Sequence, residues 1–338
     1  MTVDVDTQAR AADGAAAPAA IEGRSLSAIA WGRFRRDKTA MVSLGVLVFL
    51  LLCALFAPQI THLLGLDPYA LNPDAIDKNN GGVPIGCGTP DSGFFCGISW
   101  EHPFGVEPGT GRDLFARLLY GLRISLFISL SATIVTVFLG TIFGIVSGYL
   151  GGRTDALIGR FMDLILAFPF LLIVLALSGV FTQRLVSMGV PEGNTANITY
   201  LILVFSLFGW PYLARIVRGQ VLSVREREFV EAAIAMGSGT RRILFKEILP
   251  NLWAPIMIYA TLTLPTYIAT EAVLSFLGVG VLPPTPTFGA ILADSVTYMN
   301  LIPSYLLIPG TVLAIVVVTF NLIGDSVRDA LDPRAGRA

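Results

Sequence analysis

Long stretches without a charged residue constrain this chain more than any other feature of its sequence. A helix needs about 20 mostly apolar residues to cross the hydrocarbon core of a bilayer, which is about 30 Å thick. Four long intervals lack charge, and the apolar stretches within them are 41–57, 124–150, 164–181 and 198–214. We therefore expect a membrane-spanning helix in each of these intervals.

Two more apolar segments follow near the C-terminus. Residues 252–277 carry one charged residue, Glu271, and residues 305–324 carry none. Only 14% of the chain is charged, against about 25% in soluble domains. The predicted fold class is an all-α polytopic membrane protein with six transmembrane helices. A cleaved signal peptide is the alternative for the first span, although a tail of about 38 residues precedes it.

The distribution of Lys and Arg predicts how the chain crosses the membrane. Loops on the cytoplasmic side are enriched in these residues. With the N-terminus inside, the inner segments hold 18 of them and the outer segments hold 5. We therefore expect both termini and the 215–251 loop to lie in the cytoplasm. The net charge of −1 provides no basic field for nucleic acid.

The segments outside the spans differ in character. Residues 1–25 are rich in Ala and polar, which is typical of a disordered tail. Residues 26–38 mix aromatic and basic side chains and predict an interfacial amphipathic helix before a first span over 39–64. Residues 65–123 are expected to form an extracytoplasmic loop with an interfacial helix over 111–123. The remaining five spans form a core over 124–338.

The cysteines and the missing motifs narrow the chemistry. Cys87 and Cys96 lie nine residues apart in the outer loop, where oxidising conditions favour a disulfide over free thiols. Cys53 is expected to be a small buried residue of the first span. The sequence contains no HExxH, CxxC or GxSxG motif. We therefore expect neither a metal site nor a hydrolase site, and no cofactor bound by this chain.

The 215–251 loop is the largest charged block between the spans. Its sequence predicts a helix over 223–236, an interruption at Gly237 and Gly239, and a second helix that Thr240 caps and Pro250 ends. Apolar residues at 243–245 would give the second helix an exposed face beside Arg and Glu. Such a patch is typical of a docking surface for another protein. A surface hairpin without a partner is the alternative.

Residues of this loop resemble a known motif. Glu231, Ala232, Ala233 and Gly237, followed by residues 248–250, resemble the EAA motif of bacterial ABC importer permeases, with Glu247 where the pattern has Ile. Residues 102–105, 111–126 and 270–289 are similar to the C-type permeases of dipeptide, oligopeptide and nickel importers. The resemblance covers about residues 27–333 and implies a multi-pass protein of the bacterial plasma membrane.

The resemblance implies a type I ABC importer permease fold, in which this loop forms the coupling helix of a separate ATPase. It assigns ATPase coupling to Glu231, Ala232, Ala233, Gly237, Arg241, Arg242, Phe245, Leu249 and Pro250. The sequence has no GxxxxGK[ST] loop, so ATP and Mg would be used by the ATPase subunits and not by this chain.

The implied partners are a homologous B-type permease in a heterodimer, one or two cytoplasmic ABC ATPases and an extracytoplasmic solute-binding protein. The implied substrate is a di- or oligopeptide, with nickel, glutathione or another small solute as the alternative. An intramembrane enzyme and a passive channel are rival interpretations. The enzyme is disfavoured because the spans contain no catalytic motif. The channel is disfavoured because it would leave the helical hairpin of the 215–251 loop without a function.

Acidic residues in spans are costly and usually face protein or water. Glu271, with Ser275 one turn later, is a candidate for the translocation pathway, but pairing with another helix is the favoured interpretation. Asp163, which follows Arg160, is expected to form an ion pair at the membrane edge. Prolines at 169, 211, 255 and 265 are expected to bend helices.

Overall fold

The computed structural model describes residues 26–88 and 93–331. Within them, six helical segments are long and apolar enough to cross a membrane, which confirms the predicted number. They are α2 (Lys38–Leu55), α4 (Leu114–Leu150), α6 (Phe170–Ser187), α7 (Asn194–Val224), Thr240–Phe276 with α10 (Trp253–Phe276), and α12 (Pro303–Leu331). The predicted tail over 1–25 and the end of the core after 331 lie outside the described residues.

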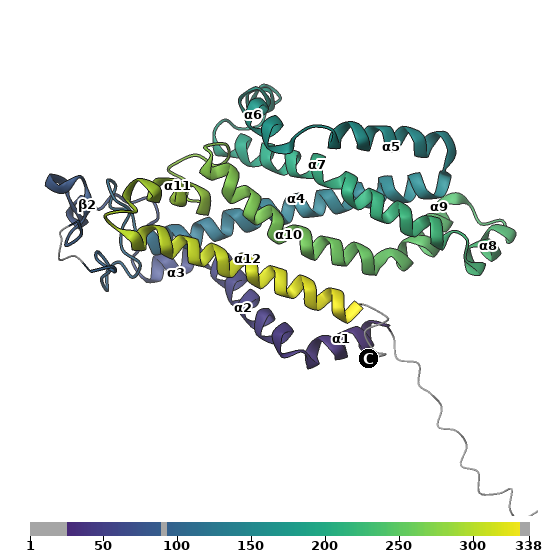
Figure 1. Ribbon diagram of the computed structural model, residues 1–338, viewed down its shortest axis with the longest axis horizontal. Coiled ribbons are helices and arrows are strands. Elements are labelled where there is room, and N and C mark those ends of the chain that lie inside the picture. The colour runs from purple at the N-terminus through teal and green to yellow at the C-terminus, as the bar shows by residue number, and fades with distance from the viewer. Residues whose placement is uncertain (1–25, 89–92, 332–338) are drawn as a thin grey trace, which may run out of the picture.

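Helices α4 and α7 form the central pair of the bundle (Figure 1). Gly140, Gly144 and Gly148 recur every four residues along α4 and face α7. A Cβ atom at any of these positions would come within 2.8 Å of an atom of α7. Small residues at this spacing let two helix backbones approach closely, as is common in membrane proteins. We call this contact the glycine seam.

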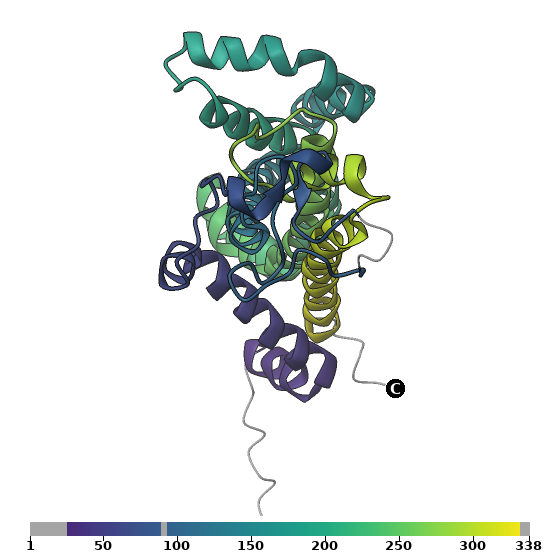
Figure 2. The ribbon, with the colours of Figure 1, turned by 90° about the vertical axis from the view of Figure 1, so that its left-hand side faces the viewer.

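The third predicted span is divided into two helices. Helix α5 (Gly152–Leu166) runs back along α7, and α6 begins only at Phe170. Pro169 lies at the break, because it lacks an N–H group and restricts the residue before it. Helix α6 is seen end-on in Figure 1 and lengthwise in Figure 2, so it crosses the long axis of the bundle. Among its residues, Val174 is buried.

The first predicted span is also shorter than expected. Helix α1 (Leu26–Arg36) ends before Lys38, where α2 begins, and a separate helix, α3 (Ala57–Leu63), follows Phe56. Asp37 caps α2 by accepting a hydrogen bond from the backbone N–H of Thr39 at 2.9 Å. Phe34 of α1 packs in a small cluster with Ala330 near the end of α12. Helix α2 packs against α12, and α12 packs against α10.

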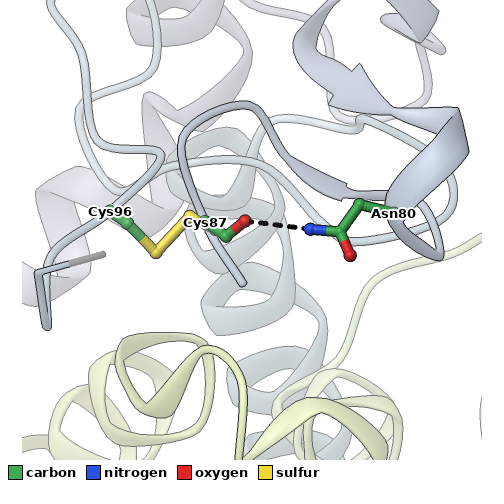
Figure 3. The surroundings of a disulfide bond; sticks show 3 residues. All are labelled: Asn80, Cys87 and Cys96. Atoms are coloured by element: carbon green, nitrogen blue, oxygen red, sulfur yellow. Dashed lines mark hydrogen bonds between the residues drawn. A yellow bond between two sulfur atoms is a disulfide. The ribbon is translucent and has the colours of Figure 1, made fainter. Parts of the chain in front are cut away.

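Residues 65–88 and 93–113 form a folded segment at the end of the bundle opposite the 215–251 loop (Figure 1). It contains η1 (Pro73–Ala75), β1 (Ile76–Asp77), η2 (Lys78–Asn80) and β2 (Val83–Pro84). The strands are antiparallel, with Ile76 opposite Pro84 and Asp77 opposite Val83. A disulfide joins Cys87 to Cys96, and Asn80 Nδ2 donates a hydrogen bond to the Cys87 carbonyl (Figure 3).

The interfacial helix predicted over 111–123 is wrong. Residue 114 begins α4, which continues unbroken to Leu150, and its first turns are buried inside the protein. Arg117 is 2% exposed because its guanidinium finds internal partners. Nη1 donates to the carbonyls of Pro68 and Pro284 at 3.2 and 3.1 Å, and Nε lies 3.5 Å from Glu107 Oε1. The charge is buried within the protein and ties the segment before α4 to the bundle.

Candidate functional site

The 215–251 loop forms a compact helical turn at one end of the bundle. Helix α7 extends to Val224, and α8 (Glu228–Ala235) follows after three residues, so the single helix predicted over 223–236 is wrong. The chain then passes through α9 (Thr240–Arg242), η3 (Ile243–Ile248) and η4 (Leu249–Leu252) into α10. Gly239 is the N-cap residue of α9, so Thr240 is the first residue of this helix and not its cap. Pro250 lies in the 3₁₀ turn η4, and the helical path continues beyond it.

Gly237 ends α8 in the left-handed conformation, with φ of 78°. The N–H of Gly237 donates to the Ile234 carbonyl at 2.9 Å, and the N–H of Ser238 donates to the Ala233 carbonyl at 3.0 Å. Glycine is preferred at this place because a Cβ atom destabilises positive φ. The backbone conformation at the end of α8 therefore explains why the EAA pattern has a glycine at position 237.

The π-helical turn η3 explains how the second part of the loop packs. Ile243 and Ile248 are both buried although they lie five residues apart. On an α-helix these positions would point about 140° apart, whereas a wider π turn brings them toward one face. Both pack with Val217 and Val221 of α7 in one apolar cluster. This contact fixes the loop against the bundle.

Large apolar side chains on the loop remain uncovered. Met236 is 77% exposed and Phe245 is 60% exposed. Phe229 and Ile234 of the same loop are also exposed, and we call these four residues the loop patch. The residues that the resemblance assigns to coupling mostly lie at this surface. Glu231, Ala232, Gly237, Arg241, Arg242, Phe245 and Pro250 are exposed, Leu249 is half-buried, and Ala233 is buried against the bundle.

Ion pairs hold the helices at the base of the loop. Arg218 donates two hydrogen bonds to Asp155 of α5, at 2.6 and 2.7 Å. The Arg218 guanidinium and the Ser147 hydroxyl lower the pKa of Asp155 to about 2. Asp163 also forms an ion pair, but its partner is Arg215 of α7, at 2.6 Å, and not the preceding Arg160.

Glu271 lies inside the protein, enclosed by its own chain. Its side chain has no solvent exposure, and its two carboxylate oxygens accept hydrogen bonds from Ser125 of α4 at 2.6 Å and from Ser275 at 2.8 Å. These bonds satisfy the carboxylate within one chain and join α10 to α4. In this structure both Glu271 and Ser275 are therefore buried, and their polar groups bond to each other and to α4.

A cavity of about 810 Å³ lies elsewhere, between the α5–α6 break, α7 and α10. Aromatic and hydroxyl side chains dominate its wall, and Arg215 is the charged residue among its lining residues. Thr263, Thr266, Tyr267 and Thr270 supply one wall. Their spacing places them on one face of a helix. The spacing can be read from the sequence, but these residues are uncharged and so do not stand out in a span, as Glu271 does.

Comparisons with known proteins agree with this architecture. Residues 140–337 match the family described as "Binding-protein-dependent transport system inner membrane component", and residues 25–80 match the "N-terminal TM domain of oligopeptide transport permease C". The chain is 37% identical to the oligopeptide transport system permease protein OppC of Haemophilus influenzae, covering 93% of this chain and 90% of the relative.

Two further relatives and one solved structure are similar. Identity is 36% to OppC of Bacillus subtilis, over 89% of this chain and 88% of the relative. It is 37% to the dipeptide transport system permease protein DppC of Alkalihalophilus pseudofirmus, over 90% and 89%. A MetNI methionine ABC transporter structure covers 65% of this chain and 98% of its own, with 22% identity and a TM-score of 0.48. By its sequence relatives, this chain belongs to the family of binding-protein-dependent transport system inner membrane components, as an ABC transporter permease.

Proposed function

We propose that this permease forms half of the pathway through which an ATP-driven importer takes up di- or oligopeptides. The observation that carries the proposal is the loop patch, in which large apolar residues stay uncovered at the surface of a rigidly held loop. Exposed apolar residues rimmed by charge are typical of protein docking sites. The relatives named as oligopeptide and dipeptide transport permeases support the peptide substrate.

The loop patch is the proposed seat of a cytoplasmic ATPase that binds ATP and Mg. Glu231 of α8 and Arg241 and Arg242 after Gly237 are exposed beside the patch. Burial of the apolar side chains would supply affinity, and the charges would set orientation. This assignment requires the loop and both termini to lie in the cytoplasm. The excess of Lys and Arg in the corresponding segments supports that orientation.

The cavity beside α7 and α10 is the proposed half-pathway, in place of Glu271 and Ser275. Hydroxyl groups on its wall can bond to peptide backbone groups of any sequence, and the aromatic rings can contact varied side chains. The second half would come from a homologous B-type permease. The disulfide-closed segment over 65–113, at the opposite end of the bundle, is the proposed contact for an extracytoplasmic solute-binding protein.

The test is co-purification of the complete complex from membranes. Met236→Glu places a charge in the loop patch, and Leu63→Glu is the matched control because Leu63 is exposed at the far end of the bundle. We expect the first variant to lose the ATPase and the control to retain it. The wild-type complex should accumulate peptides in proteoliposomes only with ATP. Retention of the ATPase by Met236→Glu would contradict the docking proposal, and an absence of uptake by an intact complex would contradict the substrate.

A further inference from the structure

Two tyrosines of α10 hydrogen-bond to the backbone of α7 at the cavity wall. Tyr259 Oη donates to the Gly209 carbonyl at 3.2 Å, and Tyr267 Oη donates to the Phe205 carbonyl at 3.0 Å. Both tyrosines line the cavity. Each bond requires α7 and α10 to hold one relative position, because the tyrosine hydroxyl must reach a backbone carbonyl oxygen on the neighbouring helix. We call this pair of tyrosines the tyrosine clamp.

Tyr267 of the clamp contacts residues of two other helices. The Tyr267 ring stacks on the Phe205 ring with 5.0 Å between centroids, and its hydroxyl lies 2.9 Å from Thr136 Oγ1 of α4. Gly209 leaves room for this hydroxyl, since a Cβ atom there would clash with Tyr267 Oη. Tyr267 thus joins α10, α7 and α4 at one point.

The clamp lies where both helices contain an internal proline. Pro211 lies inside α7 and Pro265 lies inside α10, between Tyr259 and Tyr267. Each proline lacks an N–H group, so the carbonyl four residues earlier loses its helical donor. Helices bend most readily at such places. The clamp therefore connects the two weak points of α7 and α10 to each other.

The inner parts of the same two helices lead directly into the 215–251 loop. Helix α7 ends at Val224, and α10 begins at Trp253. A movement of the loop must therefore pass along both helices before it changes the cavity. Without a cross-connection at the prolines, each helix could bend separately and the movement would be lost.

We propose that Tyr259 and Tyr267 are positioning residues that make α7 and α10 bend together, so that movement of the ATPase-bound loop reaches the cavity wall. This inference rests on the proposed function, because it requires an ATPase on the loop. It does not depend on the identity of the solute. The hydroxyl groups carry the role, and the rings alone are insufficient.

The test measures how nucleotide changes access to the cavity in the complete complex. Thr266→Cys places a thiol at an exposed position on the cavity wall, in a chain that also carries Cys53→Ala. The rate of labelling by a water-soluble maleimide is measured with and without ATP and vanadate. We expect at least a threefold change in rate in this background. Adding Tyr259→Phe and Tyr267→Phe should reduce that change to less than half, while ATP hydrolysis persists.

The matched control is Tyr149→Phe, since the Tyr149 hydroxyl has no hydrogen bond among the described residues. It should leave the nucleotide response unchanged. If the double variant does not assemble, Tyr259→Phe alone keeps the buried bonds of Tyr267 and should lower the response. An unchanged response in the tyrosine variants, with the ATPase bound and active, would overturn the clamp. Retention of the ATPase by Met236→Glu would instead contradict the docking proposal, and with it the basis of the clamp.

Discussion

The glycine seam and the 215–251 loop place large side chains in opposite ways. At the seam, α4 presents glycines, and the Leu213 and Val217 side chains of α7 lie against its backbone. On the loop, Met236 and Phe245 keep 77% and 60% of their surface exposed. The seam is complete within one chain, whereas the loop leaves apolar area uncovered.

The difference indicates which contacts make the fold and which await another subunit. Close helix packing supplies much of the stability of a membrane protein, because lipid competes with protein for apolar side chains. An apolar side chain in water has no such competitor and gains from being covered. Changes at the seam should therefore affect folding first, and changes on the loop should affect assembly while the permease stays folded.

The largest effect is expected at the seam. In Gly144→Leu, the first added atom alone would lie 2.7 Å from the Ala214 carbonyl oxygen. Overpacking of this kind costs about 3 kcal/mol when the backbones cannot separate. We expect little folded permease and a lower thermal midpoint in detergent. Gly219→Leu is the control, because nothing lies within 4 Å of a Cβ atom there. Equal stability of the two variants would show that the seam is not tightly packed.

A smaller loss of stability is expected from Glu271→Leu. This change leaves the Ser125 and Ser275 hydroxyls without their acceptor, which costs about 1–3 kcal/mol for buried groups. Glu271→Gln keeps an acceptor oxygen and should cost less. Thermal unfolding of both variants measures the difference. If Glu271→Gln instead had normal stability and weaker peptide affinity, Glu271 would contact the solute after all.

Gly237→Val should weaken the ATPase without unfolding the permease. A β-branched residue at φ of 78° is strained by roughly 1–2 kcal/mol, and α8 would lose its end. We expect about a tenfold lower affinity for the ATPase, measured by titration of the purified permease, with the thermal midpoint nearly unchanged. Gly239→Ala has room for its methyl group at φ of −69° and should bind normally. Equal ATPase affinities of the Gly237→Val and Gly239→Ala variants would show that docking does not depend on the backbone conformation at Gly237.

The smallest effect concerns the ion pairs at the base of the loop. The lowered pKa of Asp155 means that its ion pair with Arg218 stabilises the protein fully above pH 3.8 and is lost as the pH falls through about 2. Asp155→Asn should cost about 1 kcal/mol at pH 7, after screening by solvent, and progressively less below pH 3.8. Asp163→Asn removes a more exposed pair and should cost less. Thermal midpoints across pH test both, and a loss for Asp155→Asn that grows in acid would contradict this sign.

The sequence predicted those parts of the structure that depend on residues close together in the chain. Charge-free intervals are local, and six apolar helical segments follow from them. Local sequence patterns could not predict that Arg117 is buried, because its partners are groups of Pro68, Glu107 and Pro284. Without these distant groups, a cation before an apolar stretch is best placed at the membrane surface.

In the candidate site, too, local features could be predicted from the sequence, whereas contacts between distant residues could not. The glycine and the exposed Phe245 could be recognised from local features of the loop. Ile243 and Leu244 were expected on the same exposed face, but Ile243 is buried and Leu244 is half-buried because the π-helical turn packs this side against α7. Glu271 could not be placed, because Ser125, which binds its carboxylate, lies 146 residues away. The sequence predicts that Pro169 bends a single span, whereas the structure has two helices there, with α5 packed along α7 and α6 turned away from it. That choice depends on tertiary packing.

Amide hydrogen exchange of the complete complex, with and without the ATPase, tests the central claim most directly. Exchange slows where a partner covers a mobile or exposed backbone. We predict slower exchange in residues 228–249 when the ATPase is bound, and no change along the glycine seam. Equal exchange of residues 228–249 in both preparations, with the ATPase present in one of them, would contradict the assignment of this loop as the coupling element.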